Sequence, residues 1–373
     1  MEMESDFSAM KLKLLSPPHD FEQIAKIWQE LSQEVGCAYF LSWGWIENWL
    51  ACLPPDEQPQ LAVIFKDNRT QAAFFIKKTT MHRHHLIKSR VWHINTVGKN
   101  RYDNVWIEYN QFLCRPFFAI PFVEILSALP EPWDEVWLPG LDSNFFPGNT
   151  IDKTKPYVSL IQDQSASPYV DLVKVRQKGD YLSLISSNTR SQIRRAGRLY
   201  TKTYGSIELE IADSLEAAFT IFDELVSLHS ATWQKRQTIS PFAAGYVQKF
   251  HKRLIEKRFE HGEIQLLRLR AGAHTVGILY NLVLKGRVYF YQSGMNYEAD
   301  KRLKPGLVTH AEAISHNAAS GNIIYDFLGG ASRYKKSLAT DEEQLIWVRI
   351  QKRRLKFAFE NRLKALKNAL FTD

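Results

Sequence analysis

The segment Val288–Lys336 most constrains how this chain can fold, because strand, helix and strand signals follow one another closely in it. Its first residues, VYFY, are β-branched or aromatic and predict a strand over 288–291. A helical repeat of apolar residues begins at Pro305, a residue type favoured at the first helical position, and ends at Gly321. Residues 323–328 (IIYDFL) predict a second strand before a Gly-Gly turn. We therefore expect a strand–helix–strand unit here.

The start of this helix is a candidate anion site. The amides of Gly306 and Leu307 lie in the first turn, where no carbonyl of the helix accepts a hydrogen bond from them. The cations Lys301, Arg302 and Lys304 closely precede them. The spacing fits a pyrophosphate, but it also fits an ordinary helix end that binds water, so the residues alone leave both interpretations open.

The composition is that of a globular protein with acidic partners. The 373 residues are enough for two domains, and 45% hydrophobic with 24% charged residues excludes a mostly disordered chain. A net charge of +8 favours coenzyme phosphates, nucleic acid or an anionic membrane surface as partners. Residues 139–168 contain four prolines, two glycines and few apolar runs, which predicts a domain boundary. We expect one domain over residues 1–160 and a second over 161–373.

Neither a metal centre nor a disulfide framework is expected. The three cysteines, Cys37, Cys52 and Cys114, are far apart and show no ligand spacing. The histidines within residues 82–85 have no nearby carboxylate, so we interpret them as solvated or phosphate-facing side chains. The first residues lack an apolar signal core and no apolar run reaches the length of a membrane span, so we expect a soluble, cytoplasmic protein.

Two basic segments each leave two interpretations open. A helix capped by Ser186 or Ser187 carries cations spaced four residues apart, namely Arg190, Arg194, Arg198 and Lys202. This row either binds an anion or faces solvent. Residues 351–371 form a basic amphipathic pattern with an apolar stripe of Leu355, Phe359, Leu363, Leu366 and Leu370. We expect the stripe to pack on the protein's own sheet, and peripheral contact with an anionic membrane is the alternative.

The order of the predicted elements resembles a known fold. The predicted order resembles that of the GNAT acyltransferases. It consists of a strand, two helices, several antiparallel strands and then a strand that leads into a helix start. More closely, the chain resembles their CelD-like branch, relatives of the FemAB aminoacyltransferases with two GNAT-like domains in tandem. The matching segments are FLSWGWIENWL and the Tyr102-Asp103 loop in the first half, and SSNTRSQIRRAGR, LHSATWQKR, KPGL and DFLGGASRYKK in the second. The resemblance implies an α/β (α+β) fold of two tandem domains, each a mixed, largely antiparallel sheet flanked by helices.

The resemblance also implies an acyl donor and a place for it. The donor is acyl-coenzyme A, bound in the second domain where the strand ending near Gln292 and Ser293 diverges from its neighbour. Its pyrophosphate would lie at Lys304, Pro305, Gly306 and Leu307. The first domain would be the acceptor side, with a degenerate coenzyme site. The acceptor contacts that we expect are Tyr102, Asp103, Arg190, Arg194 and Trp233.

The implied chemistry is direct attack of an amine or hydroxyl on the thioester, which needs a base, an oxyanion donor and an acid for the thiolate. The candidates are Asp326 and Asp103 for the base, with His229 and His310 in reserve, Tyr291 and Tyr334 for the acid, and Lys335 for the oxyanion or an acidic acceptor. Two departures from the relatives bear on this. Ala331 and Ser332 stand where acidic residues are common, which alters acceptor recognition. Lys304 replaces a serine cap and adds a positive charge for phosphate.

The expected function is transfer of an acyl group from acyl-coenzyme A to a sugar or an envelope or exopolysaccharide precursor. One alternative is an aminoacyl-tRNA-dependent transferase of the FemAB type, since the row Arg190–Lys202 would suit RNA, although no inserted coiled-coil arm is found. Another is a non-catalytic binding subunit of a polysaccharide-synthesis complex. The residues at positions 331 and 332 favour that alternative, and the KPGL helix start opposes it.

Overall fold

The computed structural model describes residues 10–83, 87–115, 122–144, 156–330 and 332–360. Its contacts divide the chain into two compact units, of which the first comprises Met1–Trp43, Leu53–Gln164 and Leu345–Asp373. The second comprises Gly44–Cys52 and Ser165–Gln344. The chain passes from the first unit to the second after Gln164, and the expected boundary was residue 160. Two segments differ from the expectation, because Gly44–Cys52 belongs to the second unit and the chain from Leu345 returns to the first.

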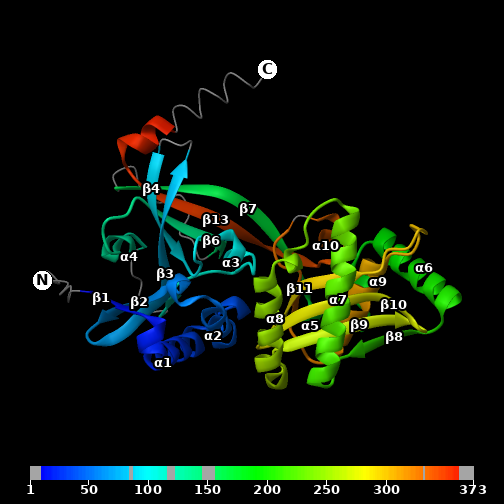
Figure 1. The fold of residues 1–373 in the computed structure, drawn as a ribbon. Coiled ribbons are helices and arrows are strands. Elements are labelled where there is room, and N and C mark those ends of the chain that lie inside the picture. The colour runs from blue at the N-terminus through cyan, green and yellow to red at the C-terminus, as the bar shows by residue number, and fades with distance from the viewer. Residues whose placement is uncertain (1–9, 84–86, 116–121, 145–155, 331, 361–373) are drawn as a thin grey trace, which may run out of the picture. The chain divides into compact units, whose positions relative to one another are not determined.

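The first unit is a mixed, mostly antiparallel sheet with the strand order β1-β2-β3-β4-β6-β13 (Figure 1). Among its described strand pairs, only β4 and β6 run in parallel. Its strands are β1 (Lys11–Leu15), β2 (Gln60–Lys66), β3 (Arg69–Arg83), β4 (Ile87–Ile94), β5 (Leu113–Cys114) and β6 (Glu135–Asp142), with parts of β7 (Tyr157–Asp171) and β13 (Asp341–Lys352). Its α-helices are α1 (Pro17–Val35), α3 (Asn100–Asp103) and α4 (Phe122–Ala128), with single 3-10 turns at Tyr39–Leu41 and Pro55–Glu57.

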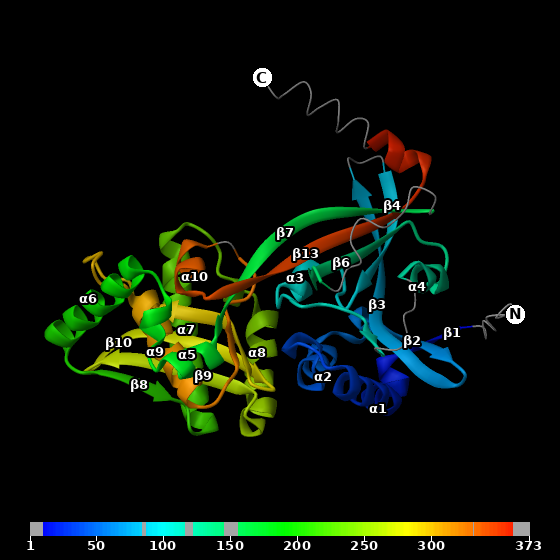
Figure 2. The ribbon, with the colours of Figure 1, turned by 180° about the vertical axis from the view of Figure 1, so that it is seen from behind.

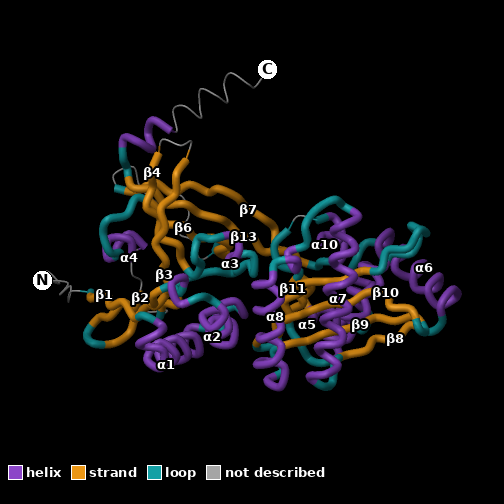
Figure 3. Tube along the Cα trace, viewed as in Figure 1, coloured by secondary structure: helices purple, strands orange, loops and turns teal. Residues whose placement is uncertain are grey.

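The second unit is also built on a mostly antiparallel sheet, with the order β7-β12-β11-β10-β9-β8 (Figure 3). Here β11 and β12 are the parallel pair. Its strands are β8 (Ile207–Ile211), β9 (Ile264–Ala271), β10 (His274–Leu284), β11 (Arg287–Met295) and β12 (Ile324–Asp326), with the remaining parts of β7 and β13. Its α-helices are α2 (Trp43–Cys52, except its first residue), α5 (Leu172–Lys178), α6 (Ser187–Tyr204), α7 (Leu215–Lys235), α8 (Gly245–Arg258), α9 (Pro305–Ala319) and α10 (Arg333–Leu338). Its 3-10 turns are Tyr181–Leu184, Pro241–Ala243 and Phe259–His261.

Helices cover both faces of the second sheet. Helix α7, with α8 beside it, lies on one face, and α9, with α5 and α6 beside it, lies on the other (Figures 1 and 2). The apolar core under α9 includes Val288, Leu279, Ile314 and Tyr325, all buried. Burial of such side chains on both faces is what holds a strand–helix–strand unit in place.

The predicted strand–helix–strand unit is present, with small differences at its ends. Helix α9 ends at Ala319 rather than beside Gly321, and β12 is shorter than the predicted strand. The physical reason for the short strand is local. The Asp326 carboxylate accepts a hydrogen bond from the Leu328 amide at 2.7 Å, and Leu328 has a φ of +60°. That turn takes the chain out of the sheet.

The basic C-terminal segment packs differently from our expectation. Residues 355–360 are helical, but Leu355 and Phe359 of the predicted stripe are 90% and 60% exposed. The buried side chains are Phe357 and Glu360, and the Arg83 guanidinium covers the Phe357 ring at 5.2 Å. The prediction that this stripe packs on the sheet is therefore wrong for Leu355 and Phe359. Leu363, Leu366 and Leu370 lie outside the described residues. None of the described helices combines the length and apolar character needed to cross a membrane.

Candidate active site

The sheet of the second unit splits at β11. Strands β11 and β12 pair over three residues only, ending where Tyr289 lies opposite Asp326. Beyond that point β11 runs on to Met295, paired with β10 on its other edge. On the side of β11 that faces β12, no strand pairing is described for the residues after Tyr289. Gln292 and Ser293, the expected point of divergence, both lie in this part, which we call the open edge of β11.

A β-bulge marks the beginning of this open part. The register places Tyr280 opposite Gln292 but Asn281 opposite Phe290, so Tyr291 is the extra residue. The Tyr291 ring packs against the His251 ring at 4.8 Å between centroids. A bulge turns one side chain and its backbone away from the regular ladder, and bulges are frequent beside active sites.

The N-terminus of α9 follows, with free backbone donors. The first helical hydrogen bond runs from the Val308 amide to the Lys304 carbonyl at 3.1 Å. The amides of Gly306 and Leu307 therefore precede the helical ladder, and no acceptor for them is found among the described residues. A Cβ placed on Gly306 would meet no atom within 4 Å, so there is room for a side chain at this position.

The cations beside this turn differ in their availability. Arg302 is 65% exposed but is held by Asp300, with N–O distances of 2.7–3.0 Å. Lys301 is exposed and Lys304 half-buried, and no ion pair to either is found in the described part of the chain. Lys301 and Lys304 are thus the two cations here that an anion can recruit without breaking a salt bridge.

Tyr334 on α10 is held by an aromatic contact. Its ring stacks on His310 of α9 at 5.7 Å and 25°. Burial raises the pKa of the Tyr334 phenol above its ordinary value, and the nearby Tyr297 adds to this, so the phenol keeps its proton at neutral pH. His310 bonds the Tyr325 hydroxyl at 3.1 Å. Burial, and then the Lys335 charge, lower the His310 pKa to about 3. A histidine buried to this degree is a poor candidate for a base that must reach a substrate.

Asp326 and Lys335 hold the turn that leads to Tyr334. The buried Asp326 carboxylate accepts from two nitrogens of Arg287 at 2.7 and 2.9 Å, as well as from Leu328. Lys335 donates to the carbonyls of Leu328 at 3.2 Å and Gly329 at 2.7 Å. Both side chains are occupied by the protein itself. Their positions therefore favour a structural role over the base and oxyanion roles that we expected.

His229 and Trp233 form a separate cluster on α7. Their rings stack at 5.4 Å and 26°, and His229 Nδ1 lies 3.0 Å from the Ser240 hydroxyl. Burial, with a smaller contribution from Arg236, lowers the His229 pKa to about 4. The structure thus brings two of the predicted site residues together, and the imidazole is neutral at physiological pH.

In the first unit, Asp103 fills the corresponding loop. Strand β4, like β11, is parallel to its neighbour and leads towards a short helix. The Asp103 carboxylate accepts from the amides of Val97, Gly98 and Lys99 at 2.7–3.0 Å. Burial raises its pKa to about 6, against the opposing effect of the three amide bonds. The amides near Gly98, where a degenerate coenzyme site was expected, already hold an internal carboxylate.

The other expected acceptor contacts are Tyr102 and the cations of helix α6. Tyr102, an expected acceptor contact, is 4% exposed, with the Arg101 guanidinium 4.4 Å above its ring. On α6, Ser186 is the cap, accepting from the Thr189 amide at 3.2 Å. The cations of this helix, Arg190, Arg194, Arg198 and Lys202, are half-buried to exposed, and Arg194 is 3.7 Å from Asp180.

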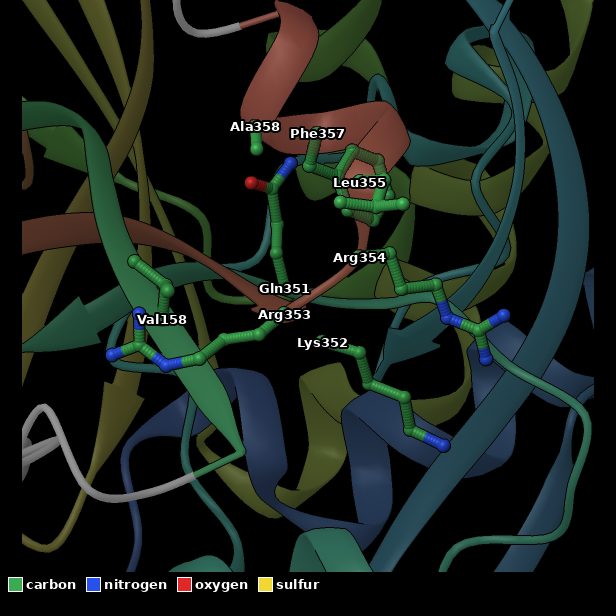
Figure 4. Close-up of a pocket in the computed structure, with 8 residues that line it drawn as sticks. All are labelled: Val158, Gln351, Lys352, Arg353, Arg354, Leu355, Phe357 and Ala358. Atoms are coloured by element: carbon green, nitrogen blue, oxygen red, sulfur yellow. The ribbon is translucent and has the colours of Figure 1, made fainter.

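A cavity of about 360 Å³ lies in the first unit instead. It is lined by Val158 and by residues between Gln351 and Ala358. The side chains of Lys352, Arg353 and Arg354 leave the backbone in different directions rather than converging on one point (Figure 4). This arrangement is not that of a phosphate site, which needs convergent donors.

In the part of the chain that the structure describes, no three histidine, cysteine or acidic side chains are grouped closely enough to hold an ion. Cys37, Cys52 and Cys114 form no disulfide. Burial raises the pKa of Cys52 and of Cys114, so neither is an activated nucleophile. The residues that sequence reasoning missed are Tyr297, beside Tyr334, and Arg287, the partner of Asp326; neither belongs to a motif.

Comparison with known proteins gives one family match and several similar structures. Residues 187–336, from α6 to α10, match the family described as "Acetyltransferase (GNAT) domain". The crystal structure of FemX superposes with a TM-score of 0.51 at 11% identity, covering 86% of this chain and 95% of FemX. A protein of unknown function from Bacteroides thetaiotaomicron gives 0.50 at 10% identity, covering 92% and 100%. A tandem GNAT protein from clavulanic acid biosynthesis gives 0.44 at 12% identity, covering 91% and 98%. No curated protein sequence matches the chain.

These likenesses concern the fold, and the family match concerns residues 187–336. The predicted fold class, two GNAT-like domains of mixed and largely antiparallel sheets flanked by helices, is confirmed. Residues 187–336 therefore resemble a GNAT acetyltransferase domain, and the chain as a whole shares its fold with FemX.

Proposed function

We propose that this protein transfers an acyl group from acyl-coenzyme A to an amine or hydroxyl of a sugar or of an envelope or exopolysaccharide precursor, as CelD-like relatives would. One observation carries the proposal. The open edge of β11 and the unpaired amides of Gly306 and Leu307 lie in one unit, within the matched GNAT domain. A strand edge offers hydrogen bonds to an amide-containing chain, and a helix start offers them to phosphate.

The donor is assigned to these groups according to its chemistry. The pyrophosphate is assigned to the helix start at Lys304, Pro305, Gly306 and Leu307, with Lys301 as an additional cation. The pantetheine arm, which carries two amides, is assigned to the open edge at Gln292 and Ser293. Tyr291, on the bulge, is then the nearest side chain to the thioester along β11. The positive charge at 301 and 304 and the open space at Gly306 support this arrangement.

After direct attack by the acceptor, the reaction needs an acid for the leaving thiolate. An amine or hydroxyl attacks the thioester carbonyl and gives up a proton to solvent, the C–S bond breaks, and the thiolate takes up a proton. We assign that proton to the Tyr334 phenol, because an undissociated hydroxyl on α10 can donate to a thiolate that lies beside it. Asp326 and Lys335 serve this step indirectly, because they fix the turn before α10. His229, the reserve candidate for the base, is buried with its pKa lowered to about 4, so it suits that role as poorly as His310 does.

Calorimetric titration with coenzyme A and acetyl-coenzyme A tests the proposal. We expect micromolar binding at one site per chain, weaker at higher salt because phosphate contacts are screened. Absence of binding to folded protein would refute it. Binding followed by no turnover with any amine or sugar acceptor would favour the non-catalytic binding subunit instead.

A second candidate function is aminoacyl transfer from charged tRNA. It rests on one observation: Arg194, Arg198 and Lys202 present a row of solvent-facing cations on α6. If an acceptor stem binds there, reversing Arg194 and Arg198 to Glu should weaken tRNA binding and reduce its dependence on salt. Equal affinity in the variant would make the row an ordinary solvated face. Coenzyme A binding should not change, which separates the two donors.

A further inference from the structure

The loop between β11 and α9, residues 296–304, is fastened at its first residue. The Asn296 amide donates to the Val276 carbonyl at 3.1 Å, and its side chain donates to the Thr275 carbonyl at 3.2 Å. Both acceptors belong to β10. The path of the loop away from the sheet is therefore fixed by two hydrogen bonds before it reaches α9.

A second attachment is made by Glu298. One oxygen of its carboxylate accepts from the Tyr200 hydroxyl at 3.1 Å, and the other lies 2.8 Å from His274 Nε2. The Tyr204 ring stacks on the His274 ring at 4.0 Å, with only 8° between the planes. The Glu298 side chain is 13% exposed. Helix α6, strand β10 and the loop thus meet at one nearly buried carboxylate, which we call the Glu298 clamp (Glu298, Tyr200, His274 and Tyr204).

The clamp continues into the apolar contacts below α9. Tyr200 shares a buried cluster with Leu303, the penultimate residue of the loop, and with Val308 in the first turn of α9. Movement of Glu298 away from Tyr200 would therefore disturb the layer on which the helix start rests. Val308 directly follows Gly306 and Leu307, so a shift of this layer would also shift their amides.

We propose that Glu298 is a positioning residue for the donor site, holding the loop so that the α9 amides meet the coenzyme phosphates. This inference rests on the proposed function. Its physical basis is preorganisation, because a loop already ordered in the free protein does not lose that conformational freedom on binding. Nothing in the motifs of the sequence singles out Glu298, and Tyr200 and His274 are far from it along the chain.

The sign of the effect distinguishes positioning from simple electrostatics. A carboxylate close to an anion site repels the anion, so removing Glu298 should tighten binding if charge alone matters. The clamp predicts the opposite, because Glu298→Ala frees the loop. Glu298→Gln keeps the shape and the acceptor for Tyr200 while removing the charge, so it should bind as well as the wild type or better.

The experiment compares Glu298→Ala, Glu298→Gln and the control Glu342→Ala, which removes the same charge from an exposed position on β13. Coenzyme A affinity is measured by calorimetry, and amide hydrogen exchange over residues 297–307 is measured without ligand. We expect Glu298→Ala to weaken binding about tenfold and to speed exchange, with the other two variants close to the wild type. Melting temperatures verify that each variant is folded.

Three results would overturn the inference in different ways. Unchanged exchange in Glu298→Ala would mean that the clamp does not hold the loop. Faster exchange with unchanged or tighter coenzyme A binding would mean that the loop is held but does not serve the donor. If the wild type binds no coenzyme A, the proposed function and the donor role of Glu298 both fail, and the exchange data still decide whether the clamp exists.

Discussion

Replacing Asp326 with alanine should destabilise the second unit rather than only slow catalysis. The side chain is fully buried and its oxygens accept from Arg287 at 2.7 and 2.9 Å, from the Leu328 amide at 2.7 Å and from Ser167 at 3.3 Å. Removing one partner of a buried ion pair costs about 3–5 kcal/mol. Arg287 keeps Glu343 at 2.6 Å, so we expect the lower end, about 3 kcal/mol. For a unit of this size that loss lowers the melting temperature by roughly 6–12 °C.

Urea denaturation monitored by tryptophan fluorescence measures this loss. Activity is measured without urea, well below the melting temperature, and is expressed per folded molecule. The control is Glu342→Ala, an exposed carboxylate on β13 whose loss should change stability by about 0.5 kcal/mol or less. An unchanged urea midpoint together with a large fall in turnover would refute the structural assignment. Asp326 would then be the general base after all, despite its contacts with Arg287.

Three further predictions concern the donor site and the response to acid. Gly306→Val should leave the melting temperature nearly unchanged, because its new atoms meet open space, but it should weaken coenzyme A binding tenfold or more by occupying the place of the phosphate; equal affinity would move the donor elsewhere. Tyr334→Phe should lower kcat about 100-fold with little change in the donor KM, since a positioned acid contributes about that much; unchanged kcat would remove the acid role. Burial lowers the pKa of four histidines to about 3 or 4, namely His93, His229, His251 and His310. Below pH 6.5 the unfolded chain therefore binds protons that the folded chain does not, so stability should be full above pH 6.5 and fall by up to about 1.4 kcal/mol per pH unit for each histidine down to about pH 4. Denaturation midpoints that stay flat between pH 6.5 and 4.5 would contradict this.

The local pattern of the sequence was sufficient for the elements that position the donor site. Within a helix, proline is tolerated only in the first turn, so Pro305 indicated where α9 begins. The β-branched and aromatic residues from Val288 onward favour a strand, so the β11–α9 unit was predictable. The open amides of Gly306 and Leu307 follow from the geometry of any helix start. These features depend on neighbours along the chain, which the sequence displays directly.

The roles of the polar side chains were not predictable in this way. Asp326 and Lys335 stand beside the Gly-Gly turn in a family motif, yet their partners are Arg287, distant in sequence, and the carbonyls of the turn itself. Asp103 stands in an open-looking loop, yet it occupies the amides of that loop. A carboxylate in a pattern is the same whether it is free or paired, because its availability depends on partners that only the fold brings close.

The sequence by itself determined the class of fold and the helix start with its cations, since periodicity and turn residues act over a few positions. Tertiary structure decided which groups remain available for chemistry. It left the Gly306 amide and the Tyr334 phenol in reach of a ligand, buried His310 and Tyr102, and joined Glu298 to Tyr200 across the loop. The reason is that hydrogen bonds and ion pairs form between segments far apart in the chain, and burial changes the pKa of each group that they enclose.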